Sequence, residues 1–188
     1  MIVFKTSAEI EIMAKACRLV AEALRIIRKE VRPGISTDHL DRVAEEYILA
    51  HGGIPAFKGY HNYPKTLCAS INDQVVHGIP SKRVLKEGDI IGLDLGAIVD
   101  GFYGDSAVTV PVGEIDPRVQ LLLRITEESL SAGISMAVVG NRLSDIGHAV
   151  QSFAEGAGFS VVTEFVGHGI GRKLHEEPQI PNYVKPGQ

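Results

Sequence analysis

Two aspartates on a predicted β-hairpin, Asp94 and Asp105, are the residues whose types and spacing have the clearest chemical meaning. Asp100-Gly101 predicts a two-residue turn, because a tight hairpin needs residues that tolerate positive φ. This turn places Val99 opposite Phe102, so Asp94 and Asp105 become diagonal neighbours on one face, about 7–8 Å apart at the backbone. Two carboxylates this close repel each other unless a cation lies between them, and a pair of divalent metal ions fits. Two surface aspartates on a solvated sheet face are the equally weighted alternative.

Three histidines accompany the carboxylates. His77 ends a predicted strand, His168 lies between two glycines that leave room for a ligand, and His175 follows seven residues later in a polar stretch. Each histidine alone favours a structural role, but together with two aspartates they favour Zn²⁺, Mn²⁺, Fe²⁺ or Co²⁺ over Ca²⁺. The segment 167–173 (GHGIGRK) could instead cradle a phosphate, but it fits neither glycine-rich phosphate motif, so nucleotide binding is disfavoured.

Helices and strands that would position these residues follow from the apolar periodicity and the capping residues. The sequence predicts helices over 6–31, 36–50, 116–137 and 144–156, and strands over 66–71, 75–79 and 159–166 besides the hairpin. Thr6 with Glu9 indicates a capping box, and Asp116 before a proline indicates a helix start. The first helix is predicted to bury one stripe, made of Ile10, Met13, Ala14, Cys17, Val20, Ala21, Leu24 and Ile27.

The two halves of the chain share an order of long helix, glycine turn, short helix and glycine stop, with Gly34 and Gly140 at matching places. We interpret this as an internal structural repeat and expect one catalytic domain over 1–188. Its first half is about 1–113, and its second half, about 114–188, would lack its final strands. A counterpart of the hairpin would begin near position 194, beyond the last residue. The segment 185–188 (KPGQ) resembles 86–89 (KEGD), which leads into the hairpin.

Composition is that of an ordinary globular chain: 188 residues, 45% hydrophobic and 22% charged. The net charge of −4 gives no reason to expect a nucleic-acid partner. Cys17 and Cys68 form no CxxC motif and indicate no disulfide framework, so the reducing cytoplasm is the expected compartment. No run of apolar residues predicts a signal peptide or a membrane span, so we expect a soluble protein.

Several motifs, in order and with matching spacing, make the whole chain resemble a type I methionine aminopeptidase. They are 59–65 (GYHNYPK), 68–72 (CASIN), 76–80 (VHGIP), 89–94 (DIIGLD), 100–105 (DGFYGD), 167–172 (GHGIGR) and 175–178 (HEEP). The resemblance implies an α/β (α+β) pita-bread fold, with two pseudo-symmetric helix-helix-sheet halves around a central antiparallel sheet. In this chain the second half would be incomplete.

The resemblance also implies roles for individual residues. Asp94, Asp105 and His168 match metal ligands, His77 matches a substrate-contacting histidine, and His175 matches the histidine that stabilises the oxyanion. The pocket for the methionine side chain is matched by Tyr60, Tyr63, Cys68 and Leu174. A thioether suits such an apolar, polarisable pocket. Leu174 is usually phenylalanine in this family, which implies a softer pocket wall.

The family reaction is removal of the initiator methionine from nascent polypeptides, at the ribosome, by a monomeric enzyme with two divalent ions (Co, Mn, Fe or Zn). Those ions bridge a water and lower its pKa. The family uses five metal ligands, and two of them, both glutamates, have no match here. We therefore expect this 188-residue chain to bind at most one metal weakly and to be inactive or impaired. An unpaired sheet edge would favour self-association.

Two alternatives keep the same fold. A proline-specific aminopeptidase or prolidase shares the ligand set but usually has an extra N-terminal domain, which this sequence lacks. A non-catalytic binding module would have no need of Asp94, Asp105 and His168 together. Cleavage of Met-Ala against Ala-Pro peptides, and metal titration, would discriminate among the three.

Overall fold

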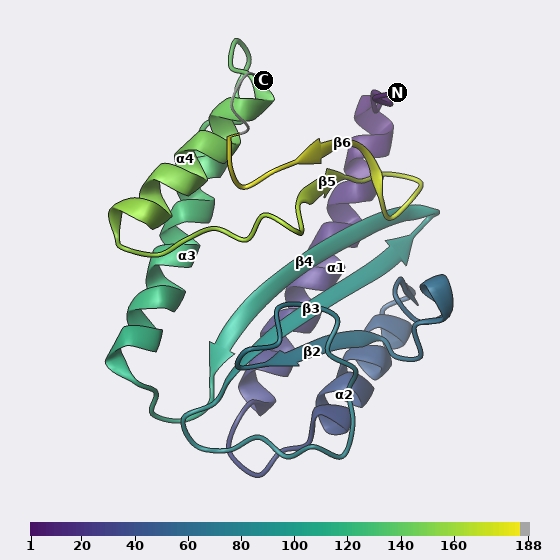
Figure 1. Ribbon diagram of the computed structural model, residues 1–188. Helices are drawn as coiled ribbons and strands as arrows, with labels where there is room; N and C mark the ends of the chain where they lie inside the picture. The colour runs from purple at the N-terminus through teal and green to yellow at the C-terminus, as the bar shows by residue number, and fades with distance from the viewer. Residues whose placement is uncertain (185–188) are drawn as a thin grey trace. The chain divides into compact units, whose positions relative to one another are not determined.

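The computed structural model describes residues 1–184, which form two compact units (Figure 1). The hairpin unit comprises Phe4–Ile115 and Ile170–Leu174. The helix-pair unit comprises Met1–Val3, Asp116–Gly169 and residues from His175 onward. The division between the two units near residue 115 lies close to the predicted boundary at 113. Residues 170–174, which belong to the predicted second half, pack with the hairpin unit. The interpretation as one catalytic domain stays a prediction, and the likeness between 185–188 and 86–89 lies outside the described residues.

Two helices of the hairpin unit begin at the predicted caps. Helix α1 spans Ser7–Glu30, and its capping box is confirmed because Thr6 Oγ1 accepts from Glu9 N at 3.3 Å while Thr6 N donates to Glu9 Oε2 at 3.0 Å. Helix α2 spans Thr37–Ala50, and the Ser36 hydroxyl caps it by accepting from His39 N. These caps satisfy backbone N–H groups that the first turn of a helix leaves unpaired.

The hairpin unit contains a four-stranded antiparallel sheet built on β3. The strands are β1 (Ile54–Pro55), β2 (Leu67–Ile71), β3 (Ile90–Val99) and β4 (Phe102–Pro111), with a short 3₁₀ turn, η1, at Tyr60–Asn62. Strand β4 pairs with one edge of β3 over its whole length, while β1 and β2 share the other edge. Because side chains alternate along a strand, β3 presents one face to the helices and the opposite face to the candidate site.

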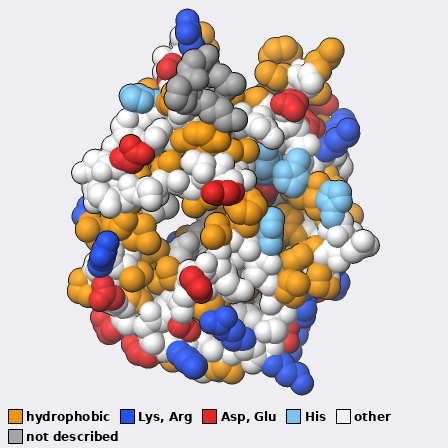
Figure 2. Space-filling model, viewed as in Figure 1, with side chains coloured by type: hydrophobic (Ala, Val, Ile, Leu, Met, Phe, Trp, Pro, Cys, Tyr) orange, Lys and Arg blue, Asp and Glu red, His pale blue; other side chains and the backbone are white. Residues whose placement is uncertain are grey.

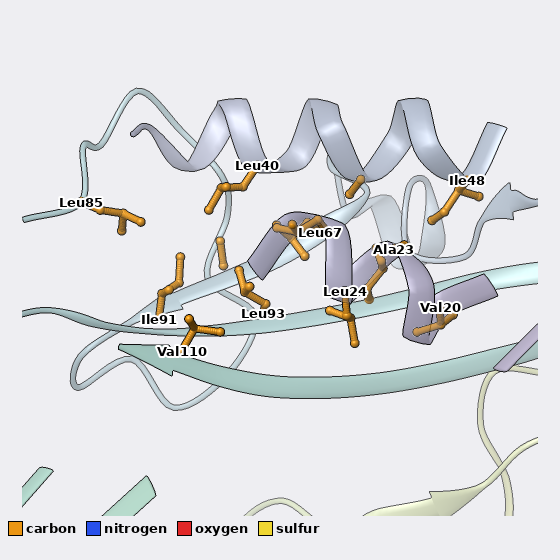
Figure 3. Packing of buried hydrophobic residues seen from close by; sticks show 14 of the residues in the cluster. Val20, Ala23, Leu24, Leu40, Ile48, Leu67, Leu85, Ile91, Leu93 and Val110 are labelled. Atoms are coloured by element: carbon orange, nitrogen blue, oxygen red, sulfur yellow. The ribbon is translucent and has the colours of Figure 1, made fainter. Parts of the chain in front are cut away.

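The main core lies between this sheet and helices α1 and α2 (Figure 3). From β3 it takes alternate residues, Ile91, Leu93, Leu95 and Ala97, and from the helices it takes residues such as Val20, Leu24, Leu40 and Ile48. This burial fixes the register of β3, since a one-residue slip would turn every apolar side chain outward. The same alternation sends Asp94 to the face away from the helices.

The predicted stripe of α1 is partly wrong. The buried residues are Ala16, Val20, Ala23, Leu24 and Ile27, whereas three members of the predicted stripe are exposed, namely Ile10, Cys17 and Ala21. The stripe is rotated because Gly104 of β4 lets the helix backbone approach closely: a Cβ there would lie 2.6 Å from the Ala16 carbonyl carbon. The strand, rather than the periodicity alone, determines which side of α1 is covered.

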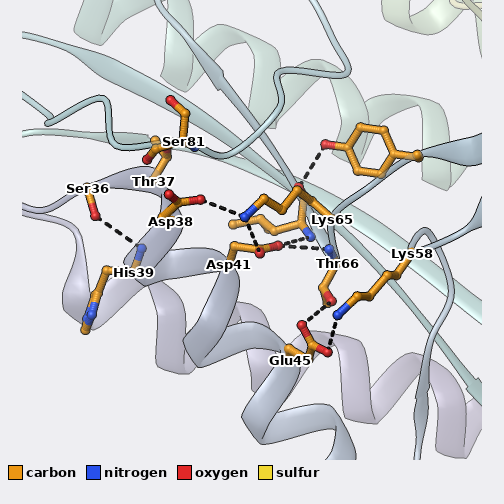
Figure 4. A network of polar contacts seen from close by, with 12 residues as sticks. Ser36, Thr37, Asp38, His39, Asp41, Glu45, Lys58, Lys65, Thr66 and Ser81 are labelled. Carbon is orange, nitrogen blue, oxygen red and sulfur yellow. Dashed lines mark hydrogen bonds and ion pairs between the residues drawn. The ribbon is translucent and has the colours of Figure 1, made fainter.

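A polar network ties α2 to the start of β2 (Figure 4). Asp41 is nearly buried, and its Oδ1 accepts from the backbone N–H groups of Thr66 and Leu67, each at 2.9 Å. Lys65 Nζ lies 2.7 Å from Asp38 Oδ1 and 3.5 Å from Asp41 Oδ2. A buried carboxylate is tolerated here because it is both hydrogen-bonded and paired with a cation.

Two predicted strands do not form. Residues 75–79 are a loop, in which Gly78 O accepts from Ala69 N without extending into a ladder. Residues 159–166 are irregular, and the strand there is β5, Gly167–Gly169. Both segments are rich in β-branched and aromatic residues, which favour strands only where a partner edge is available.

The helix-pair unit contains α3 (Pro117–Ser135) and α4 (Leu143–Gly156) packed against each other. Asp116 caps α3 as predicted by accepting from Arg118 N at 2.7 Å, while α4 begins one residue before the predicted Ser144. Strands β5 and β6 (Glu176–Ile180) pair antiparallel, with an irregularity between His168 and Gly169. Gly147 of α4 allows the backbone at Pro181 and Tyr183 to approach closely.

The exposed surface carries both signs of charge. On the face in view in Figure 2, acidic and basic side chains are interspersed with apolar ones. None of the helices in residues 1–184 combines the length and the apolar character that crossing a membrane requires.

Candidate metal and substrate site

The carboxylate pair has the geometry that the sequence predicts. Asp94 lies opposite Ala107 and Asp105 lies opposite Gly96, so the two aspartates are diagonal neighbours on one sheet face. The turn residues Asp100 and Gly101 both have positive φ, at 49° and 79°. The two-residue turn thus determines the register that brings both carboxylates to one place.

The two carboxyl groups interact directly. Burial, the charge of Asp105 and a hydrogen bond between the two side chains together raise the pKa of Asp94 to about 7, with burial the largest cause. This is the behaviour of two acids that share one proton because neither can be fully hydrated. A divalent cation would replace that proton and neutralise both charges, so this pair of oxygen donors fits a divalent metal.

Cys68 connects this carboxylate pair to an apolar cluster. On β2, Cys68 is directly opposite Asp94 of β3, so both residues belong to the same stretch of sheet. The cluster around it contains Ala56, Phe57, Cys68 and Leu174, with Tyr60, Tyr63, Ile98, Tyr103 and Ile170 packed against it. All four residues predicted to line the methionine pocket are therefore brought together, although their role in binding stays a prediction.

The cluster is a neutral environment. Burial raises the pKa of the Cys68 thiol to about 11, and burial together with Cys68 raises the pKa of the Tyr63 hydroxyl. Burial therefore favours the neutral thiol of Cys68 over the thiolate, which is the nucleophilic form. What remains is a polarisable, uncharged surface of the kind that suits a thioether.

Segment 170–174 is held onto the hairpin unit by polar contacts that sequence reasoning missed. The Arg172 guanidinium lies 4.2 Å from the centre of the Phe102 ring and pairs with Glu9 Oε1 at 3.3 Å. Tyr103 N donates to Gly171 O at 2.9 Å. Leu174 is thereby packed into the cluster. Phe57 and Ala56 were also missed as lining residues, although they immediately precede the motif at 59–65.

Two of the histidines lie together in the helix-pair unit. The rings of His168 and His175 have centroids 4.2 Å apart. Gly169 O accepts a hydrogen bond of 2.9 Å from His168 Nδ1, and a carbonyl can only accept, so Nε2 carries the lone pair that a metal would use. His77 belongs to the hairpin unit, in the loop between β2 and β3, with φ of 59°.

Within residues 1–184 no group of three or more His, Cys, Asp or Glu side chains is gathered so that it could hold a metal ion. The pair Asp94 and Asp105 is brought together in one unit, and the pair His168 and His175 in the other. The predicted ligand set of Asp94, Asp105 and His168 thus stays a prediction.

Comparison with known proteins places this geometry in a family. Residues 11–188 match the model of metallopeptidase family M24, and the chain belongs to that family. It is 50% identical over 188 residues to a methionine aminopeptidase of Clostridium perfringens and equally to methionine aminopeptidase 1 of Bacillus subtilis. All of the chain is covered in both cases, and 76% of each relative.

Solved structures agree with the sequence relatives. The methionine aminopeptidase of Thermotoga maritima superposes with a TM-score of 0.97 at 48% identity, covering 100% of this chain and 76% of that one. The prolidase of Pyrococcus furiosus, at 24% identity and a TM-score of 0.85, shares the fold alone. These likenesses confirm the mixed helix-and-sheet, pita-bread fold. Membership of a metallopeptidase family implies divalent metal cofactors.

Proposed function

We propose that this chain is the catalytic part of a metal-dependent aminopeptidase that hydrolyses the peptide bond after an N-terminal methionine. The observation that carries this function is the pairing of Cys68 with Asp94, which joins the apolar cluster to the carboxylate pair on neighbouring strands. A methionine side chain in the cluster would bring its own α-amine and scissile carbonyl toward the carboxylates. The relatives at 50% identity, which are named methionine aminopeptidases, support the same substrate.

The metal ligands of the proposed enzyme include Asp94 and Asp105, with His168 as the imidazole ligand that the resemblance implies. Carboxylate and imidazole donors together suit Co, Mn, Fe or Zn ions. A bound divalent ion would supply Lewis acidity, polarising the scissile carbonyl and lowering the pKa of water near neutral pH.

The remaining residues bind and orient the substrate. Tyr60, Tyr63, Cys68 and Leu174 would enclose the thioether and exclude water from it. His77 would contact the substrate next to the scissile bond. His175 would donate a hydrogen bond to the carbonyl oxygen as negative charge develops there, which stabilises the transition state more than the ground state.

The cellular setting belongs to the same proposal. The substrates would be nascent polypeptides, met in the cytoplasm as they leave the ribosome, and the enzyme would act as a monomer. Both cysteines, Cys17 and Cys68, are free thiols, as a reducing compartment requires.

A polypeptide of these 188 residues alone holds three of the five ligands that the resemblance implies. We therefore expect such a polypeptide to bind at most one metal ion weakly and to release methionine slowly or not at all. Metal titration by calorimetry measures the stoichiometry directly. Two tightly bound ions with rapid turnover would contradict this expectation and would indicate that a second chain, or an unrecognised residue, completes the site.

The test of the function itself is methionine release from Met-Ala-Ser by the full natural protein loaded with Mn²⁺ or Co²⁺. We expect Asp94→Asn and Asp105→Asn to lose activity by at least about a hundredfold, because each removes a charge from the metal site. Asp73→Asn, in an exposed loop, is the matched control. Cleavage of Ala-Pro in place of Met-Ala would make the protein a proline-specific peptidase, and metal binding without cleavage of either would make it a binding module.

A further inference from the structure

The loop that carries His77 is attached to β2 by the residue that follows it. Gly78 O accepts from Ala69 N at 2.7 Å, and Gly78 N donates to Ser70 Oγ at 3.1 Å. The Tyr63 hydroxyl has one proton, which it shares between two carbonyl acceptors, Leu67 O at 2.9 Å and Gly78 O at 3.1 Å. Every backbone polar group of Gly78 is therefore occupied, and two of its three partners are side-chain hydroxyls.

The backbones of this loop and of β2 are in close contact at Gly78. A Cβ added to Gly78 would lie 2.7 Å from the Ala69 carbonyl carbon and 2.8 Å from Ser70 Cα, so only glycine fits at position 78. Gly78 is buried although both of its neighbours, His77 and Ile79, are exposed. Gly78 thus fixes the loop directly after the exposed histidine, and the loop is held again at Ser81, whose N–H donates to Thr37 Oγ1 at 2.9 Å.

His77 itself has a backbone conformation that needs outside support. Its φ of 59° is in the left-handed region, which costs a non-glycine residue about 1 kcal/mol. Such a conformation persists only where surrounding contacts hold it. The contacts of Gly78 contribute to this support, because the peptide bond between residues 77 and 78 is shared by both.

We propose that the hydroxyl groups of Tyr63 and Ser70 are positioning groups for His77, which they orient by holding Gly78 against β2. This inference rests on the proposed function, in which His77 contacts the substrate. It gives Tyr63 a second role beside its ring surface in the apolar cluster, since its hydroxyl connects the cluster to the histidine loop. Ser70 lies in the motif 68–72 but outside the apolar cluster, and this inference gives its hydroxyl a specific role.

The proposal is tested by a double-mutant cycle in the full natural protein, with kcat and KM for Met-Ala-Ser as readouts. We expect Tyr63→Phe and Ser70→Ala each to lower kcat about tenfold while changing KM less than about twofold, because each removes one hydrogen bond from the Gly78 backbone. In a His77→Ala background neither change should reduce kcat further. Ser70→Thr, which keeps a hydroxyl, should restore most of the activity.

Tyr47→Phe, which removes a hydroxyl from α2 far along the chain from this loop, is the control and should leave both constants unchanged. Full additivity, in which Tyr63→Phe or Ser70→Ala costs as much without His77 as with it, would overturn the proposal, because their effect would then be structural and independent of the histidine.

Amide hydrogen exchange in the metal-free protein provides a readout that needs no activity. We expect Ser70→Ala to speed exchange of the Gly78 N–H about tenfold or more, and to leave amides in the middle of α1 unchanged. Unchanged exchange at Gly78 in an active protein would overturn the inference and leave the proposed function standing. A protein that releases no methionine but shows the exchange effect would overturn the function, and with it the catalytic role of His77.

Discussion

At the scale of single residues, the close approach of Asp94 and Asp105 destabilises the metal-free protein relative to a variant that lacks one of the two charges. The pKa of Asp94 is higher in the folded protein than in the unfolded protein, so folding favours the protonated carboxyl. The stability that this protonated form contributes is present below about pH 4 and is lost as the pH rises to about 7. We expect Asp94→Asn to increase the free energy of unfolding of metal-free protein by about 1–3 kcal/mol at pH 8 and by much less at pH 5. Urea denaturation at both pH values measures this.

Asp73→Asn is the control for the loss of one charge, because this residue is exposed in the loop after β2. It should change stability by no more than about 0.5 kcal/mol at either pH. A loss of stability in Asp94→Asn at pH 8 would show that the two carboxylates are well solvated, which contradicts the description of a partly dehydrated pair.

Substitution of Leu174 tests the packing of the apolar cluster without changing any charge. It is 3% exposed and packs with Phe57 and Cys68, although its segment lies far from both in the sequence. We expect Leu174→Ala to cost about 2–4 kcal/mol of folding stability because it leaves a cavity, and Leu174→Met to cost less than about 1.5 kcal/mol. Thermal unfolding of both variants checks this, and equal costs would mean that the cluster collapses around the smaller side chain.

At the scale of elements, Asp41 of α2 determines how β2 begins and therefore where Cys68 lies. Asp41→Ala would leave the N–H groups of Thr66 and Leu67 buried without their acceptor. We expect a cost of about 3 kcal/mol, because buried unsatisfied donors and the loss of a buried charge partner both destabilise. Urea denaturation, with amide exchange at Leu67, measures the global and the local effect together.

Asp38→Ala is a matched control, because Asp38 pairs with the same Lys65 but its side chain is 37% exposed. An exposed ion pair contributes little, so this change should cost less than about 1 kcal/mol. Similar costs for the two variants would show that the Lys65 ion pair, and not the two backbone hydrogen bonds, carries the effect of Asp41.

The elements that the sequence could predict are those determined by local chemistry. The Asp100-Gly101 turn determines the hairpin register, and with it the pairing of Asp94 and Asp105, because both depend on residues within one hairpin. The caps at Thr6, Ser36 and Asp116 are local in the same sense. They were predictable because each needs only a side-chain oxygen a few residues from the N–H groups that it satisfies.

Features that depend on distant partners could not be predicted. Cys17 is exposed because a different side of α1 packs against Gly104 of β4. Residues 75–79 are a loop, in which Gly78 bonds to β2 without forming a ladder. The attachment of Arg172 to Phe102 and Glu9 is likewise made of tertiary contacts between residues far apart in the sequence. Periodicity reports the apolar face of an element but contains no information about which partner will cover it.

At the scale of the whole molecule, the two units differ in how much they bury. All buried residues of the main core lie between Val20 and Val112, so this core is complete within the hairpin unit. In the helix-pair unit the buried residues of α3 and α4 are small or few, namely Ile125, Ser129, Gly133, Gly147 and Ala154. Large apolar side chains of α3 remain open to solvent, with Leu130 58% and Ile134 64% exposed.

This difference predicts how fragments would behave. We expect residues 1–115 to fold alone with a cooperative thermal transition, because the apolar burial that offsets chain entropy is contained in that segment. The cluster around Cys68 would be looser there, since Leu174 is missing from it. Residues 116–188 alone should show at most partial helicity and no sharp transition, because two helices with so little shared burial are marginal in water. Circular dichroism melting and amide exchange on both fragments measure this. A cooperative transition in 116–188, with none in 1–115, would mean that the apolar core of the hairpin unit is not what stabilises the molecule.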